Sequence, residues 1–398
     1  MSASRTINTN PRWSSGAMLV VFGMFGFFGL FWGAFAVLLA DLSDALDLSP
    51  GPLGAALFAG AAASIVSMAL LGWMADRLGR RIFILISLCV FGLGVSGLAF
   101  AGSYVALLAT LMVLYAASGL YDVGINAAAV DFERAAGRRL MSFFHAAFSA
   151  GGVVGALSAG ALLQSGAEYS SVYLAVLVPL GGILLAVGLV SFPTPQRPPD
   201  DANASGALGR SGTLWLVAII ATLGLLSEGE MEHWSGVYLR NSLELPALLG
   251  ASGVAVFFAA MAVGRFGSGF VVVCFGDRRT LLGAGLLTAG GMTLSLATRE
   301  PFVVVVGFLL VGLALSAVVP IAFSVAGDLA PGRAGAAVSL VTTLSYGGFL
   351  VGPVIVGGLA ELAGLRLALG TIVVAGALIS ILSLRMPGQK PRLPEVAE

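Results

Sequence analysis

Ionisable side chains inside long apolar stretches are the residues of this 398-residue sequence that most directly suggest chemistry. A charge at the centre of a bilayer costs about 2.5–3.5 kcal/mol on insertion scales, so such groups are functional candidates by default. Asp122 and Asn126 are four residues apart and would share one helix face, about two turns from the end of their helix. His145 follows at a similar depth in the next apolar stretch. These groups could carry a proton, or could form a structural hydrogen-bonded cluster.

A second set of acids follows in the second half of the chain. Glu228 and Glu232 would share a helix face, whereas Glu230 would point elsewhere, with Trp234. The pattern suggests a periplasmic gate, a proton site or a cation site. The alternative is that this helix ends early, with a local break at Gly229, and that the acids lie in water.

Arg265 lies within a further apolar stretch. It could pair with a carboxylate across a cavity or bind an anionic group of a substrate, and the alternative is that it reaches the cytoplasmic interface by snorkelling. The first apolar stretch is rich in aromatic residues. Phe28, Trp32 and the later Trp234 are candidates to line a cavity, although such side chains more often face lipid or neighbouring helices.

The composition defines the elements that must position these side chains. The chain is 58% hydrophobic and 10% charged, with a mean hydropathy of +1.00, whereas soluble domains carry roughly 25% charged residues. A spanning helix needs about 20 apolar residues, and uniform runs of this length predict an all-α polytopic membrane protein. The twelve predicted spans are 17–40, 51–73, 82–101, 104–130, 140–164, 170–192, 213–239, 247–272, 280–298, 301–326, 335–360 and 365–384.

The basic residues predict the orientation of these spans. Sixteen of the twenty Lys and Arg residues fall in loops on the side of the N-terminus, three fall on the other side, and Arg265 lies within a span. Cytoplasmic loops carry an excess of Lys and Arg. We therefore expect a multi-pass protein of the bacterial inner (cytoplasmic) membrane, with both termini in the cytoplasm.

The longest break between spans divides the chain near its middle. Residues 193–212 are rich in Pro, Gly and Asp and are typical of a flexible cytoplasmic linker. We therefore expect an N-terminal six-helix lobe in residues 1–192, and a C-terminal six-helix lobe with a polar tail in residues 213–398.

The two halves also resemble each other. A Ser-Ala-Gly-Gly run from Ser149 recurs as Ser-Tyr-Gly-Gly from Ser345, 196 residues later (345 − 149). Gly79 and Gly276 each precede a pair of arginines, with an offset of 197 residues (276 − 79). The agreement between these two offsets predicts parallel six-helix repeats related about the membrane normal.

Other classes of function have little support in the sequence. Cys89 and Cys274, the two cysteines, allow no disulfide framework or metal motif, and no phosphate-binding loop ending in Lys-Ser/Thr occurs. We therefore expect no cofactor, no metal and no enzymatic site. The net charge of zero suggests no nucleic-acid partner. The expected partners are the lipid bilayer and a small-molecule substrate, with the protein a monomer.

One loop carries a family signature. Residues 72–81 resemble the G-x-L-A-D-R-x-G-R-R loop of the major facilitator superfamily, between the second and third spans. An Asp at a helix end followed within a turn by several Arg can form charge-assisted hydrogen bonds to a neighbouring helix terminus, so this loop could act as a conformational lock. The alternative is an ordinary positive-inside loop. In the second copy, Val273 replaces Asp76. The motif residues of the lock are Gly72, Asp76, Arg77, Gly79, Arg80 and Arg81.

A second stretch suggests a branch of that superfamily. Asp122 and Asn126, then Glu133-Arg134 and the run from Leu140 to His145, are similar to the fucose-permease-like or YbjJ-like bacterial branch. The chain departs from that branch in its first span, which lacks an acidic residue.

The resemblance implies a secondary active transporter that works by alternating access, and the buried acids Asp122, Glu228 and Glu232 suggest that transport is coupled to protons. The favoured substrate is a sugar-like or other small polar metabolite. One alternative is an antiporter that exports drugs or other amphipathic compounds, suggested by the aromatic first span. An alternative of another class is a membrane sensor of the same fold that does not transport.

Overall fold

The computed structural model describes residues 15–136, 140–193, 211–329 and 334–386. Within these ranges, twelve helices are long and apolar enough to cross a membrane, and no strand occurs. A helix satisfies the hydrogen bonds of its own backbone N–H and C=O groups. It must do so inside a membrane, because hydrocarbon offers no hydrogen-bond partner. The predicted all-α polytopic fold is therefore confirmed. Most of the predicted linker 193–212, and the tail from 387, lie outside the described residues.

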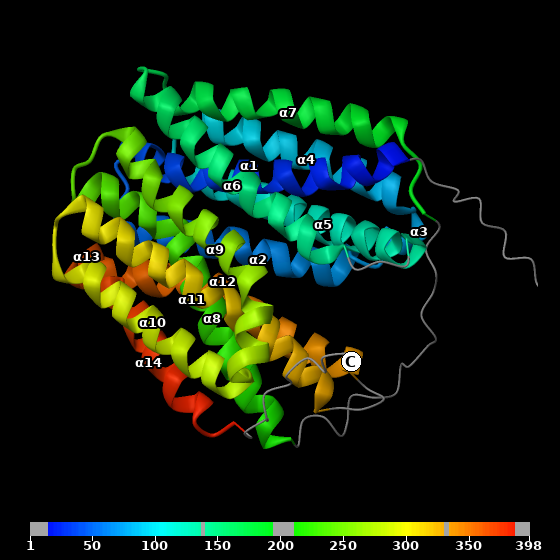
Figure 1. Cartoon of the computed structure of the whole chain (residues 1–398). Coiled ribbons are helices and arrows are strands. Elements are labelled where there is room, and N and C mark those ends of the chain that lie inside the picture. The colour runs from blue at the N-terminus through cyan, green and yellow to red at the C-terminus, as the bar shows by residue number, and fades with distance from the viewer. Residues whose placement is uncertain (1–14, 137–139, 194–210, 330–333, 387–398) are drawn as a thin grey trace, which may run out of the picture.

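The helices form two bundles, which Figure 1 shows above and below each other. The first, which we call the N-terminal bundle, contains α1 (Ser15–Ala45), α2 (Pro50–Leu71), α3 (Met74–Arg77), α4 (Arg80–Phe100), α5 (Tyr104–Ala136), α6 (Met141–Gln164) and α7 (Tyr169–Leu189). The second, the C-terminal bundle, contains α8 (Gly212–Val237), η2 (Tyr238–Ser242), α9 (Ala247–Phe275), α10 (Asp277–Ala297), α11 (Pro301–Asp328), α12 (Ala334–Ala363), α13 (Leu365–Ala368) and α14 (Gly370–Ser383).

Three helices differ from their predicted spans in ways that affect the site. The helix α5 continues six residues past the predicted end at 130, so Asp122 lies fourteen residues before the end of the helix (136 − 122), about four turns rather than two. The alternative of a local break at Gly229 is wrong, because α8 runs unbroken to Val237, and the predicted span to 239 ends instead in the π-helical turn η2. The last span is interrupted at Leu369, between α13 and α14.

Glycines bring the inner helices of the N-terminal bundle into backbone contact. A Cβ atom on Gly29 of α1 would lie 1.8 Å from the carbonyl oxygen of Phe148, and one on Gly151 of α6 would lie 1.9 Å from that of Gly26. The pair α8 and α12 repeats this packing more loosely, since a Cβ on Gly348 would lie 2.4 Å from the carbonyl oxygen of Thr222. Small residues allow such close approach between membrane helices.

The backbone turns repeat along the chain. Among the described residues, positive φ angles occur in three pairs that are 197 or 198 residues apart. Positive φ is uncommon for residues other than glycine, and glycine supplies it where the chain makes a tight turn. The repeat predicted from sequence therefore extends to the turns before three pairs of helices. These pairs are Asp47 and Glu244 (51° and 56°), Gly79 and Gly276 (82° and 78°), and Gly166 and Gly364 (93° and 81°).

The same repeat relates the contacts between the bundles. The helix α2 packs against α12, α6 packs against α9, and α1 packs against α8. A Cβ on Gly54 would lie 3.1 Å from the Cα of Gly357, and one on Gly160 would lie 2.5 Å from the Cβ of Ala251. Ala251 follows Gly54 by 197 residues, as Gly357 follows Gly160. Figure 1 shows the bundles diverging from these contacts toward the end of the molecule where α3 lies.

The close packing of α1 on α6 gives a stability prediction. Gly29→Ala should lower the stability of the detergent-solubilised protein by about 1–3 kcal/mol, the usual cost of overpacking, because the new methyl group meets backbone that cannot rotate away. Thermal unfolding followed by tryptophan fluorescence measures the change. Gly182→Ala in α7 is the matched control, since nothing lies within 4 Å of its added Cβ. Equal melting temperatures for the two variants would contradict this packing.

Candidate functional site

Polar side chains from both bundles gather between them, near the middle of α5, α8 and α12. Tyr346 of α12 marks their common location, because the charges of Asp122, Glu228, Glu232 and Arg265 all act on its hydroxyl group. The charge of Arg265 also acts on His145. We call this set the polar centre, and its members are Asp122, Asn126, His145, Ser149, Glu228, Glu232, Arg265 and Tyr346.

Arg265 connects the two bundles. Its Nη2 donates to Oε1 of Glu228 on α8 at 3.0 Å, and its Nη1 donates to the hydroxyl oxygen of Ser149 on α6 at 3.1 Å. The exposed fractions are 29% for the arginine side chain and 13% for the glutamate side chain. The snorkelling alternative is therefore wrong, because the guanidinium group is held by a carboxylate within the protein.

Asp122 and Asn126 form a local pair on α5. The amide nitrogen of Asn126 donates to Oδ1 of Asp122 at 2.8 Å and to its backbone oxygen at 2.9 Å. His145 is not part of this pair: its ring packs edge-on against Phe25, with centroids 5.4 Å apart. Within the described residues no hydrogen bond joins His145 to either partner. The three predicted residues therefore face the same region without forming one bonded cluster.

The three acids of α8 have different surroundings, as their spacing predicts. Glu228 pairs with Arg265, whereas Glu230 faces the interior of the C-terminal bundle and accepts a hydrogen bond from Thr371 of α14 at 3.0 Å. Glu230 is 0% exposed and Glu232 is 9% exposed. The alternative that the acids lie in water beyond an early helix end is therefore wrong. Glu232 has no hydrogen bond or ion pair in the described part of the chain.

A buried hydrogen bond crosses between the bundles beside these acids. The hydroxyl oxygen of Tyr115 on α5 lies 2.9 Å from Nε2 of His233 on α8, and Nδ1 of His233 lies 2.8 Å from the carbonyl oxygen of Gly229. The carbonyl can only accept, so Nδ1 carries the proton and Nε2 accepts from the tyrosine. The two rings line a small pocket together with Leu57 and Phe349.

The aromatic candidates separate into two kinds. Phe28 is buried among Phe91 and Tyr121, and Trp234 has no exposed surface and donates to the backbone oxygen of Pro353 at 3.2 Å. In this conformation both pack inside their bundles rather than lining the space between them. Trp32 is half-buried and lies against Tyr115, with ring centroids 5.0 Å apart.

The signature loop forms a network at the arginine-rich end of the molecule. Arg80 donates to Asp76 at 2.6 Å and to Asp131 of α5 at 2.8 Å. Arg77 lies over the ring of Trp73, and Arg81 is exposed. Gly72 ends α2, and Gly79 makes the turn before α4 with its positive φ. Within the described residues, these partners all belong to the N-terminal bundle.

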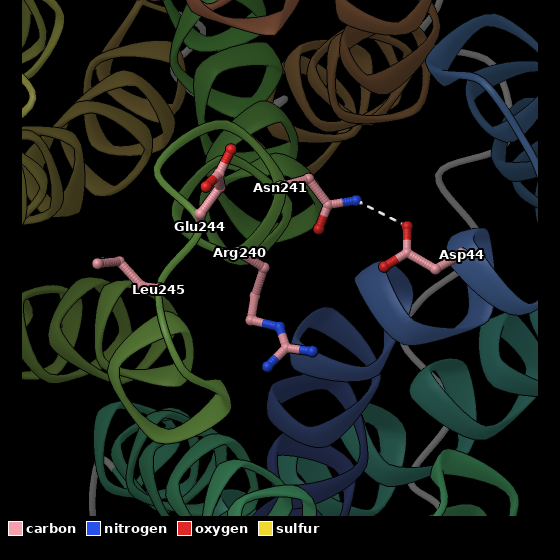
Figure 2. Close-up of a pocket in the computed structure, with 5 residues that line it drawn as sticks. All are labelled: Asp44, Arg240, Asn241, Glu244 and Leu245. Carbon is pink, nitrogen blue, oxygen red and sulfur yellow. Dashed lines mark hydrogen bonds between the residues drawn. The ribbon is translucent and has the colours of Figure 1, made fainter.

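At the opposite end, polar contacts join the bundles. Arg240 of η2 pairs with Asp41 of α1 at 2.8 Å. Figure 2 shows the amide group of Asn241 directed at Asp44, to which it donates at 3.0 Å. The backbone N–H of Gly51 donates to Glu361 of α12 at 2.9 Å. We call this end the contact end, and its residues are Asp41, Asp44, Gly51, Arg240, Asn241 and Glu361.

Sequence reasoning missed several of these residues. Asp131, Asp41 and Asp44 lie at or beyond the ends of predicted spans, where an acid needs no special explanation. His233 is different, since it lies among the acids of α8 and is one of two histidines in the chain. Its position in an apolar stretch was a signal that could have identified it. Within the described ranges, no three His, Cys, Asp or Glu side chains converge as metal ligands.

Twelve spanning helices in two repeated bundles, with ionisable groups buried between them, define the class of membrane protein to which secondary transporters belong. The family profile described as Major Facilitator Superfamily matches residues 20–273 and 251–398. A protein of Yersinia pestis described as an uncharacterized MFS-type transporter is 32% identical over 344 residues, which cover 86% of this chain and 89% of that protein. The chain belongs to the major facilitator superfamily.

Solved structures agree on the fold. The crystal structure of a mutant of the nucleoside transporter NupG has a TM-score of 0.75 at 15% identity, and covers 93% of this chain and 98% of its own. The crystal structure of a D-xylose–proton symporter has a TM-score of 0.73 at 13% identity, and covers 93% of this chain and 96% of its own. At these identities the likeness establishes the shared fold.

The pairing of Arg265 gives a testable asymmetry. Arg265→Ala should destabilise the protein more than Glu228→Gln, because the first leaves a buried carboxylate without its partner while the second keeps an acceptor for the guanidinium group. Hydrogen bonds to charged groups contribute about 1.5–3 kcal/mol, which bounds the expected loss. Thermal unfolding in detergent at one pH measures both variants. A larger loss for Glu228→Gln would contradict the pairing.

Proposed function

We propose that the protein is a proton-coupled secondary active transporter that moves a small polar organic solute, sugar-like or another polar metabolite, by alternating access. The polar centre is the substrate and proton site of this proposal. The partners are the solute, protons and the surrounding bilayer, and the transporting unit is a monomer.

The contact of Arg265 with both Glu228 and Ser149 is the observation that carries this proposal. A buried ion pair that also reaches across the interface links three events, namely protonation of the carboxylate, release of the guanidinium group, and movement of one bundle against the other. Protonation of Glu228 would remove the charge that holds Arg265. A substrate group could then replace that partner.

The two ends of the molecule support alternating access. The contact end holds ion pairs and hydrogen bonds between the bundles, whereas the partners of the signature loop lie in one bundle. We infer that rocking breaks the first set and brings the signature loop to the facing bundle, where Gly72, Asp76, Arg77, Gly79, Arg80 and Arg81 act as the lock. The excess of basic residues at the end that carries the signature loop supports a cytoplasmic location for that end, in a bacterial inner membrane. Residues 1–192 and 213–398 are the two moving lobes, and 193–212 is their linker.

The surroundings of the polar centre favour a polar solute over an amphipathic drug. Carboxylate, amide, hydroxyl and imidazole groups supply hydrogen bonds that hydroxyl-rich solutes need. The aromatic side chains of α1 that suggested drug export are mostly buried against their own bundle, as for Phe28 and Phe31. Similarity to the fucose-permease-like or YbjJ-like branch supports the same substrate class.

Proton coupling is tested in proteoliposomes that contain a pH-sensitive dye. Glu228→Gln and Asp122→Asn should each reduce substrate-dependent proton movement by about tenfold or more, since 1.4 kcal/mol of lost coupling is a factor of ten. Exchange of labelled for unlabelled substrate, which needs no net proton movement, should be reduced less. A panel of sugars, amino sugars and nucleosides supplies the substrates.

Glu230→Gln is the matched control, because Glu230 is buried in the same helix but faces α14. Substrate flux without any pH change in the wild type would end the proton-coupling proposal and indicate a uniporter or another ion. Absence of flux for every solute would favour the sensor alternative.

The contact end gives a second functional prediction. Arg240→Ala should expose the interface from that end, because it removes the ion pair with Asp41. A loss of about 1 kcal/mol shifts a two-state equilibrium roughly fivefold. The readout is the labelling rate of Leu57→Cys by a membrane-impermeant maleimide in a background with Cys89→Ser and Cys274→Ser. Leu57 is buried between the bundles and should react about fivefold faster in the Arg240 variant.

Arg299→Ala is the control for that measurement. Arg299 lies in the loop between α10 and α11 and makes no ion pair within the described residues, so its removal should leave labelling of Leu57→Cys unchanged. An unchanged rate in the Arg240 variant would show that this ion pair does not hold the contact end.

A further inference from the structure

Glu232 is the one strongly buried acid of the described residues that the protein itself leaves without a partner. Three acidic residues are at most 9% exposed: Asp131, Glu230 and Glu232. Asp131 pairs with Arg80 at 2.8 Å, and Oε2 of Glu230 accepts from Thr371 at 3.0 Å while its Oε1 is buried without a partner among the described residues. Glu232 makes no hydrogen bond or ion pair within the described ranges, although an isolated carboxylate is costly in the membrane interior.

The position of Glu232 places this carboxylate between the bundles. Four residues later on the same face of α8, a Cβ on Gly236 would lie 3.0 Å from the backbone oxygen of Ala36 on α1. The charge of Glu232 acts on Tyr115 of the N-terminal bundle and on Tyr346 of α12. The carboxylate therefore belongs to the interface that opens and closes, unlike Glu230, which faces α14.

The three carboxyl groups of the polar centre outnumber its one guanidinium group, so bound protons or added cations must offset the excess negative charge. Its carboxylates are Asp122, Glu228 and Glu232, and its guanidinium group is that of Arg265. Arg265 is already engaged by Glu228 and Ser149, and Asp122 has the neutral amide of Asn126. A positive group brought by the substrate would supply the missing partner of Glu232.

Aromatic rings near this carboxylate suit an ammonium group. The hydroxyl oxygen of Tyr115 lies 2.9 Å from Nε2 of His233, the residue that follows Glu232 on α8, and Trp32 packs against Tyr115 with ring centroids 5.0 Å apart. Tyr346 approaches the same region from α12. Rings of this kind attract cations through their faces, and an adjacent carboxylate adds an ion pair.

We propose that the transported solute carries an ammonium group, as in an amino sugar or another amine-bearing polyol, and that Glu232 is the residue that pairs with it. This inference rests on the proposed function and names its substrate class. Arg265 and Glu228 remain the coupling pair, and Tyr115, Trp32 and Tyr346 form the aromatic surroundings of the amine. A neutral analogue with a hydroxyl in place of the amine leaves Glu232 without its partner and binds more weakly.

Binding to matched pairs of solutes tests this assignment without any gradient. The full chain in lipid nanodiscs is titrated at pH 7 with glucosamine and glucose, glucamine and sorbitol, and tyramine and tyrosol. We expect the amine of at least one polyol pair to bind at least tenfold tighter than its neutral partner, which corresponds to about 1.4 kcal/mol. Glu232→Gln should remove that discrimination, whereas Glu230→Gln should retain it.

Glu232→Asp keeps the charge and guards against a trivial loss of folding: it should retain part of the preference for the amine, in protein that is monodisperse on size exclusion. Equal binding within every pair, no binding by any amine, or a preference that survives Glu232→Gln would overturn the assignment. A preference confined to tyramine would also overturn it, by indicating an amphipathic amine. Because binding is measured here and proton movement is measured in proteoliposomes, either proposal can fail while the other stands.

Discussion

The interior of a bilayer offers no water to a charged group, and this constraint organises the polar chemistry of the molecule. Burial of a lone carboxylate is costly, so each buried acid must be paired, be protonated, or await a partner. Asp131 has Arg80, Glu228 has Arg265, and Glu232 has no hydrogen-bond or ion-pair partner among the described residues. Pairings that lie within one bundle can persist while the bundles move. Those that cross between the bundles cannot, so their positions decide which contacts a conformational change must break.

How much of the structure could be predicted from the sequence depends on how far apart in the chain the interacting residues lie. Spans are local, because about 20 apolar residues suffice to define one, and all twelve were found within a few residues. The shared face of Glu228 and Glu232 is equally local, since it depends on helix geometry. The partners of Arg265 were harder to predict from sequence, because Glu228 is 37 residues away and Ser149 is 116 residues away. Only the packing of three helices brings them together.

The ends of helices were the least predictable feature for a related reason. Hydropathy locates the apolar segment, but a helix can continue into water where its polar side chains find partners. The helix α5 does so because Asp131 binds Arg80, while Glu133 accepts the backbone N–H groups of Leu140 and Met141. These contacts join α5 to the next helix. The depth of Asp122 was underestimated because the extension depends on contacts that no local pattern records.

The repeat conserves backbone geometry while the ionic contacts differ between the halves. Gly79 and Gly276 make equivalent turns, yet the residue after each is Arg80 in one half and Asp277 in the other. Position 328, which is 197 residues after Asp131, is also an aspartate, so the ion pair of the first half cannot form in the second. At the contact end, by contrast, Asp44 and Asn241 are 197 residues apart and bond to each other. Equivalent residues meet only near a symmetry axis, so this contact lies close to the pseudo-twofold axis that relates the two bundles. The two ends of the molecule are therefore held differently: the network of the signature loop lies within one bundle, whereas this contact joins both bundles.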